Sequence, residues 1–145
     1  MKKIKLSVFF VLISIFASSC ASTSVTCEGN LLQDDINYFI NAKGNFDEDI
    51  LTEQKIELRI DLTNYLKYTS IDTLYNNFKE EYLKFNEYDG VIVNVEKNGN
   101  FIIIKMEFNL ATVDKEIYEK LDIENGKITY KDFIKEFTGI GITCK

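Results

Sequence analysis

Carboxylates are the side chains of this sequence best suited to chemistry. They gather in three short runs, Asp34-Asp35, Asp47-Glu48-Asp49 and Glu80-Glu81. Paired carboxylates catalyse glycoside hydrolysis, and converging oxygens bind Ca²⁺, but these runs lack the EF-hand spacing and no feature selects one pair. We therefore expect solvated acidic turns with no catalytic residue and no metal site. A carboxylate-based or metal-assisted envelope hydrolase is kept as the alternative.

Other common catalytic groups are missing from the sequence. It contains no histidine, which removes His-based triads, His-ligated zinc and the commonest general base. After residue 20 the only serines are Ser22, Ser24 and Ser70. Neither GxGxxG nor GxxxxGK[ST] is present, so no dinucleotide or P-loop cofactor is expected. The sequence favours a protein that is not an enzyme.

The first 19 residues have the pattern of a secretory leader. Lysines at positions 2, 3 and 5 precede an apolar run, Leu6 to Ala17, which is shorter than the roughly 20 residues of a membrane-spanning helix. The following segment, Ala17 to Cys20, resembles the lipobox of bacterial lipoproteins, although that motif usually has Leu where Ala17 stands. The alternative is an ordinary signal peptide cut near Ala17 or Ser19.

The lipobox resemblance implies an anchor at Cys20. In that family the cysteine receives a diacylglyceryl thioether, the leader is cut before it, and the new amino terminus is often acylated, for example with palmitate. Two or three acyl chains suffice for stable membrane binding. We therefore expect a signal peptide at 1–19, a lipidated cysteine and short tether at 20–27, and one domain at 28–145. The protein would lie in the bacterial cell envelope, on the extracytoplasmic side of the membrane.

The charge of the chain limits its partners. The leader holds three of the 17 Lys and Arg and none of the 23 Asp and Glu, so the mature chain has 14 against 23 and a net charge of −9. A chain this acidic is not expected to bind nucleic acid.

Two cysteines, Cys27 and Cys144, remain once Cys20 is acylated. Disulfides persist in the exported environment that the leader implies, and the spacing of these residues matches no metal motif. We therefore predict a Cys27–Cys144 disulfide. Two reduced, partly buried thiols are the alternative.

The segment from Tyr88 to Leu110 predicts a β-hairpin. Asn98-Gly99 separates two apolar, β-branched runs, and this dipeptide favours a two-residue type I′ turn. Such a turn places Lys97 opposite Asn100 and sets three pairs on one face, which are Val95 with Ile102, Val93 with Ile104 and Val91 with Met106.

Alternating apolar residues predict an earlier hairpin from Ile36 to Leu62, with turn residues between Gly44 and Asp49. An apolar stripe predicts a helix from Ser70 to about Asn86. Thr69 with Asp72 resembles a capping box at its start.

Two shorter helices are expected near the C-terminus. Asp114 can cap one that ends near Leu121, and Thr129 with Asp132 resembles a capping box for another that runs through Phe137. Gly139 is the expected C-terminal cap of the second.

These elements predict an α+β fold. It is a two-layer domain with a four-stranded, mostly antiparallel sheet of two hairpins, packed by a long helix, plus short C-terminal helices. The leader, this element order and the segment Phe85 to Val91 resemble the YehR-like small bacterial lipoproteins. The ending Gly141 to Lys145, together with Thr26-Cys27, is similar to members from low-GC bacteria. The resemblance covers nearly the whole mature chain and implies a fold, an anchor and a location, but no catalytic residue.

The outer face of the sheet is the expected place for function. Alternation turns Phe39, Ile92, Phe101 and Ile103 away from the long helix. Contiguous apolar patches on soluble proteins are usually covered or functional. Either residues 111–145 or Leu31-Leu32 cover these side chains, or the patch binds an envelope protein or a small apolar ligand. The sequence thus favours a non-catalytic binding module.

Overall fold

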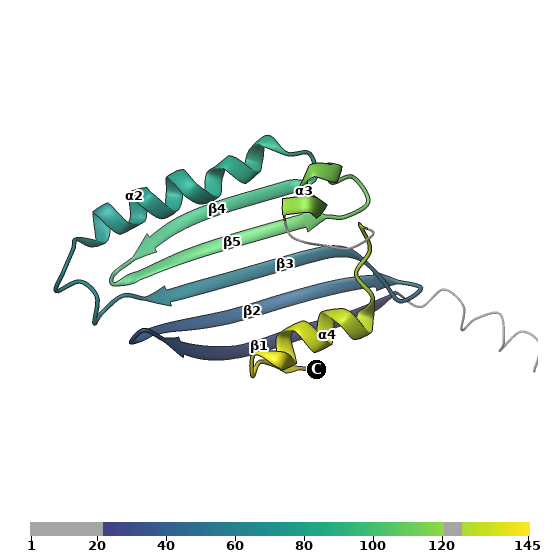
Figure 1. Ribbon diagram of the computed structural model, residues 1–145, viewed down its shortest axis with the longest axis horizontal. Helices are drawn as coiled ribbons and strands as arrows, with labels where there is room; N and C mark the ends of the chain where they lie inside the picture. Colours follow the sequence, from purple (N-terminus) through teal and green to yellow (C-terminus); the bar gives the residue numbers. More distant parts are fainter. Residues whose placement is uncertain (1–21, 121–125) are drawn as a thin grey trace, which may run out of the picture.

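The computed structural model describes residues 22–120 and 126–145, so the leader and Cys20 lie outside the described residues. Six antiparallel strands form one sheet in the order β4-β5-β3-β2-β1-β6 (Figure 1). The strands are β1 (Thr23–Gln33), β2 (Ile36–Asp47), β3 (Ile50–Asp61), β4 (Val91–Asn98), β5 (Phe101–Asn109) and β6 (Thr143–Cys144). The helices are α2 (Ile71–Tyr82), the 3-10 helix η1 (Leu83–Glu87), α3 (Lys115–Lys120) and α4 (Tyr130–Gly139). None of these helices is long and apolar enough to span a membrane.

The prediction of a four-stranded sheet packed by a long helix is wrong, because β1 and β6 extend the sheet to six strands. Residues 23–27, predicted as part of a tether, form the first half of β1. β1 pairs with β2 along its whole length, from Thr23 opposite Phe46 to Gln33 opposite Ile36. Its inward residues are mostly small, so the apolar alternation that marks a strand is weak here.

The turns at both ends of β2 are built from acidic residues. Asp34 and Asp35 join β1 to β2, and Glu48 and Asp49 join β2 to β3. All four have positive φ, between 48° and 78°, which is the requirement of a type I′ turn. Two of the three acidic runs therefore have a structural role as two-residue hairpin turns, while Glu80-Glu81 lies in α2. Gly44, expected in the turn, lies inside β2.

The β4–β5 hairpin forms, but its predicted register is wrong by two residues. Asn98 lies opposite Phe101, so the turn residues are Gly99 and Asn100, and Val95 pairs with Ile104. Among these turn residues only Gly99 has positive φ, 58°, which fits a type II′ turn with glycine at its first central position. A shift by two residues keeps every side chain on its predicted face, so Val91, Val93 and Val95 are buried.

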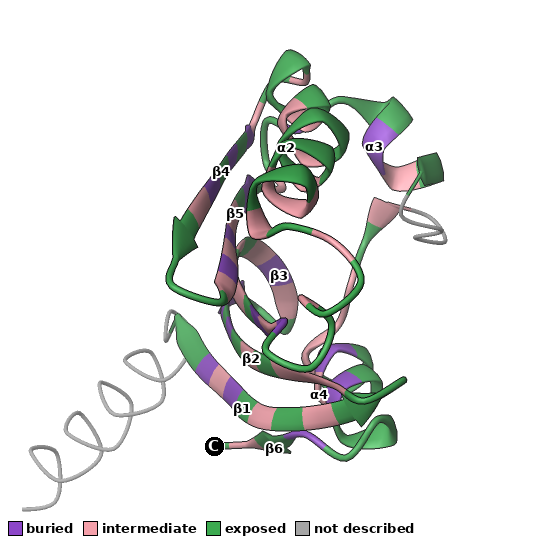
Figure 2. Ribbon diagram, turned by 90° about the vertical axis from the view of Figure 1, so that its left-hand side faces the viewer, coloured by how far each residue is buried: buried purple, intermediate pink, exposed green. Residues whose placement is uncertain are grey.

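All four helices cover the same face of the sheet, which curves around them (Figure 2). α2, η1 and α3 pack over β3, β4 and β5 around Ile102, Ile104 and Ile117. α4 packs over β1, β2 and β3 through Phe133 and Phe137. The core is therefore two adjoining clusters on one side of a single sheet.

The helix caps agree in part with prediction. Ser70, rather than Thr69, caps α2 by accepting a hydrogen bond from the Thr73 N–H at 3.1 Å. Thr129 caps α4 as expected, accepting from the Asp132 N–H at 3.1 Å. Gly139 is the last residue of α4, and the glycine with positive φ that follows it is Gly141.

The free edge of β4 is occupied by a side chain of η1. Asn86 donates to the Val93 carbonyl at 2.9 Å and accepts from the Val93 N–H at 2.6 Å. The amide thus fills the place of a neighbouring strand at this residue and protects the edge from pairing with other chains.

Candidate functional site

The two cysteines lie directly opposite each other on β1 and β6, and the predicted Cys27–Cys144 disulfide is confirmed. Their Cα atoms are 4.0 Å apart. On the neighbouring pair, the backbones of Thr26 and Lys145 exchange two hydrogen bonds of 2.9 Å. The cysteines therefore occupy a non-hydrogen-bonded pair, where side chains approach most closely in an antiparallel ladder. The cysteine predicted for lipidation, Cys20, is outside the described residues.

The sheet face turned away from the helices, here called the open face, is not covered by any described element (Figure 2). Residues 111–145 were one candidate cover, but Val113, Ile117 and Phe133 all pack into the core on the opposite face. Leu31 joins the core cluster under α4, while Leu32 is 68% exposed. Neither expected cover lies over the open face in the part of the chain that the structure describes.

Strand pairing brings three of the four predicted patch residues together. On the open face Phe39 lies opposite Arg59, and Arg59 lies opposite Ile103. Phe101 occupies the next outward position on β5, and its ring centroid is 6.5 Å from that of Phe39. These residues, Phe39, Arg59, Phe101 and Ile103, form what we call the open-face patch.

Ile92 is separate from this patch. It is 65% exposed and pairs with Glu107, four residues along β5 from Ile103. That separation corresponds to about 13 Å along a strand. The predicted patch of four apolar residues is therefore wrong in including Ile92.

Arg59 is the member of the candidate site that sequence reasoning missed. Its guanidinium carbon lies 5.2 Å from the ring centroid of Phe101 and 6.0 Å from that of Phe39, within the range of cation–π contact. It is the only arginine in the sequence, beside 16 lysines. The only signal in the sequence was a single arginine on a strand, and its place beside two outward-facing aromatic residues follows only once the pairing of the strands is known.

Apart from Ile92 and Leu32, the rest of the open face is mostly polar, and two ion pairs lie on it. Lys55 bonds Glu107 at 2.9 Å, and Lys105 bonds Glu96 at 3.1 Å. The hydrogen bond to Glu107 raises the pKa of Lys55 above its usual value. Beside the patch, the hydroxyl and N–H of Thr63 donate to Asp61 and lower the pKa of that carboxyl. Four charged side chains outside the patch, Lys55, Glu107, Lys105 and Glu96, are therefore paired with each other on this face.

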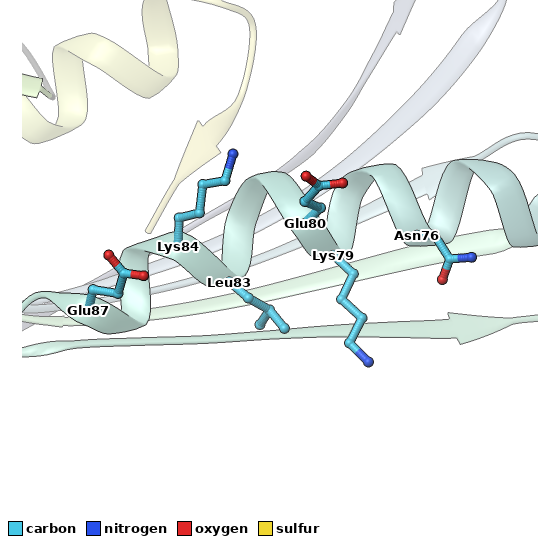
Figure 3. Close-up of a pocket in the computed structure, with 6 residues that line it drawn as sticks. All are labelled: Asn76, Lys79, Glu80, Leu83, Lys84 and Glu87. Carbon is cyan, nitrogen blue, oxygen red and sulfur yellow. The ribbon is translucent and has the colours of Figure 1, made fainter.

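The carboxylates of the described residues do not gather around a common metal-binding point. Within residues 22–120 and 126–145, no group of three Cys, Asp or Glu side chains is placed to hold a metal ion. A shallow hollow of about 490 Å³ lies along α2 and η1 and is lined by Asn76, Lys79, Glu80, Leu83, Lys84 and Glu87. Figure 3 shows these side chains spreading in different directions rather than pointing into a common cavity.

Burial in the larger core cluster raises the pKa of the Tyr82 phenol. The folded state therefore favours the neutral phenol, and this stabilisation is present below the ordinary tyrosine pKa of about 10 and lost as pH rises through the higher folded-state pKa. We expect the thermal midpoint to fall more steeply above about pH 10 in the wild type than in Tyr82→Phe. Tyr68→Phe is the matched control, because Tyr68 is 73% exposed. Parallel pH profiles for the wild type and Tyr82→Phe would contradict this prediction.

Comparison with known proteins supports the fold and nothing more. No family model matches the chain, and no curated protein matches it. Among solved structures, the chain is similar to the NMR structure of a protein from Streptococcus pneumoniae TIGR4, with a TM-score of 0.56 and 12% sequence identity over 86% of each chain. At this identity the likeness concerns the arrangement of the elements alone.

Proposed function

We propose that this protein is a membrane-anchored bacterial envelope lipoprotein whose domain is a non-catalytic binding module. The open-face patch is the observation that carries the proposal, because it places two aromatic rings, an arginine and an isoleucine side by side on an uncovered face. Aromatic residues and arginine are the types most enriched at protein interfaces. A partner protein fits this surface better than a small apolar ligand, since the patch lies on an open face.

The proposed anchor rests on the segment Ala17 to Cys20 and on its resemblance to a lipobox. The Cys27–Cys144 disulfide supports export, because disulfides are stable mainly outside the reducing cytosol. The similarity to YehR-like small lipoproteins supports the same location. The carboxylate-hydrolase alternative has no comparable support among the described residues.

The position of the patch within the sheet fits a partner beyond the membrane surface. The described strands begin at Thr23, and the row of side chains containing Phe39 and Arg59 crosses β1 at Asn30. Seven residues of strand span about 23 Å. An anchor at Cys20 would thus leave the patch well away from the point where the chain enters the domain.

The anchor is tested by metabolic labelling with a palmitate analogue. The wild type should incorporate the label and remain with the membrane fraction, while Cys20→Ala should lose both properties. Cys144→Ala, changed at the other end of the chain, should keep the label. Equal labelling of Cys20→Ala and the wild type would disprove the anchor.

The binding surface is tested by the double change Phe101→Ser with Ile103→Ser. Both side chains lie on the open face, so we expect the free energy of unfolding to fall by only about 1 kcal/mol, as is usual for partly exposed positions. Chemical crosslinking in intact cells should capture a partner with the wild type and no longer capture it with the double variant. Ile92→Ser is the matched control, since Ile92 is exposed on the same face outside the patch. A loss of stability of more than about 3 kcal/mol would identify the patch as core instead.

A further inference from the structure

We propose that Arg59 recognises a carboxylate of the partner protein, and that the flanking phenylalanines and Ile103 receive the apolar group next to it. This inference rests on the proposed binding function and assigns the chemistry of that same surface. It identifies the partner segment as one with an acidic side chain or a terminal carboxylate beside an apolar side chain.

The two phenylalanines hold the guanidinium in place. Arg59 lies on the central one of three paired strands, with Phe39 on β2 and Phe101 on β5, and its guanidinium carbon is within 6.0 Å of both ring centroids. A guanidinium that stacks on an aromatic face keeps the N–H groups at its edge available. Those groups form the planar fork that matches a carboxylate in two hydrogen bonds.

Arg59 also has no ion partner within the described residues. The nearest acidic groups on the open face are used elsewhere or lie apart from it. Asp61 accepts two hydrogen bonds from Thr63, and Glu96 is bonded to Lys105. Glu57 lies two residues away on the same strand and forms no ion pair with Arg59. An exposed guanidinium that its neighbours leave unpaired is the charge complement of a partner carboxylate.

The surroundings favour a single negative charge over a polyanion. Asp61, Glu57 and Glu96 share the open face with Arg59, and the whole chain has a net charge of −6. Such a field opposes a phosphate group or nucleic acid more strongly than a monovalent carboxylate. The neighbouring rings and Ile103 select an apolar group beside that carboxylate.

The test uses N-acetylphenylalanine and its neutral amide, N-acetylphenylalaninamide, as probes in NMR titrations of the labelled domain. The acid should bind about tenfold more tightly than the amide, the effect of one charge-assisted contact, and should shift the Arg59 Nε–H resonance most. Arg59→Gln should remove the difference between acid and amide. Arg59→Lys should keep only part of it, because lysine retains the charge but loses the planar fork. Lys43 is a cation on the same face outside the patch, so Lys43→Gln should leave the difference in affinity between acid and amide unchanged.

Equal binding of the acid and the amide to the wild type would overturn the proposal. So would tighter binding of phenyl phosphate than of the acid, since it would assign the site to a phosphate. In crosslinked cells, a partner retained by Arg59→Gln but lost from Phe101→Ser with Ile103→Ser would refute the carboxylate and leave the binding function standing. A partner retained by both variants would refute the binding function itself.

Discussion

Reduction of the Cys27–Cys144 disulfide is expected to lower the free energy of unfolding by about 4 to 5 kcal/mol. The bond joins residues 117 positions apart, so it restricts nearly the whole domain in the unfolded state. Domains of this size are stable by only about 5 to 15 kcal/mol, so the loss would be a large share of the total. Urea unfolding with and without a phosphine reductant measures it directly.

The double variant Cys27→Ala with Cys144→Ala provides the control. Its stability should resemble that of the reduced wild type, and the reductant should not change it further. β6 has only two residues, so we expect its pairing with β1 to weaken without this covalent link. Hydrogen exchange at Lys145 should therefore become fast in the double variant. An unchanged unfolding midpoint on reduction would show that the bond contributes little.

Features set by neighbouring residues were predicted best from the sequence. Thr129 caps α4 through Asp132, three residues away, and both halves of this contact are visible in the sequence. The β4–β5 hairpin was also predicted, with every side chain on its correct face. Its register was missed because Asn98-Gly99 is compatible with two turns, and only the backbone shows that Gly99 takes the first central position.

β1 was missed because its sequence gives a weak signal. Its inward positions include Val25, Cys27 and Gly29. A glycine fits at position 29 because Ile142 packs against it, and an added Cβ would lie 2.7 Å from the Ile142 side chain. That contact joins residues more than 100 positions apart, and β6 depends on β1 in the same way. The six-stranded sheet was therefore not accessible to reasoning from local patterns.

The candidate site was predicted only in part for the same reason. Alternation alone placed Phe39, Phe101 and Ile103 on the outer face. The position of Arg59 between the two rings requires the β2–β3–β5 strand order, in which β5 enters the sheet beside β3 although α2 and β4 separate them in the chain. Ile92 was included because side-chain alternation gives the face but not the distance along it.

Truncation of Phe133 is expected to be the most damaging single substitution in the α4 region. Phe133 is 1% exposed and packs edge-on against Phe46 at 5.4 Å between ring centroids. It also lies over Gly44, where an added Cβ would be 3.1 Å from its ring, so the helix and β2 are in close contact here. Phe133→Ala should therefore lower the free energy of unfolding by about 3 to 5 kcal/mol.

The measurement is urea unfolding of the oxidised protein, with Lys131→Ala as the control on the exposed side of α4. The control should change stability by no more than about 0.5 kcal/mol. Because Phe133 lies on the face of the sheet opposite the open-face patch, the variant at low temperature should still distinguish N-acetylphenylalanine from its amide. A loss below about 1 kcal/mol would mean that α4 is not packed as the structure shows. Removing a fully enclosed aromatic ring lowers the free energy of unfolding by more than that unless the site collapses around the space left behind.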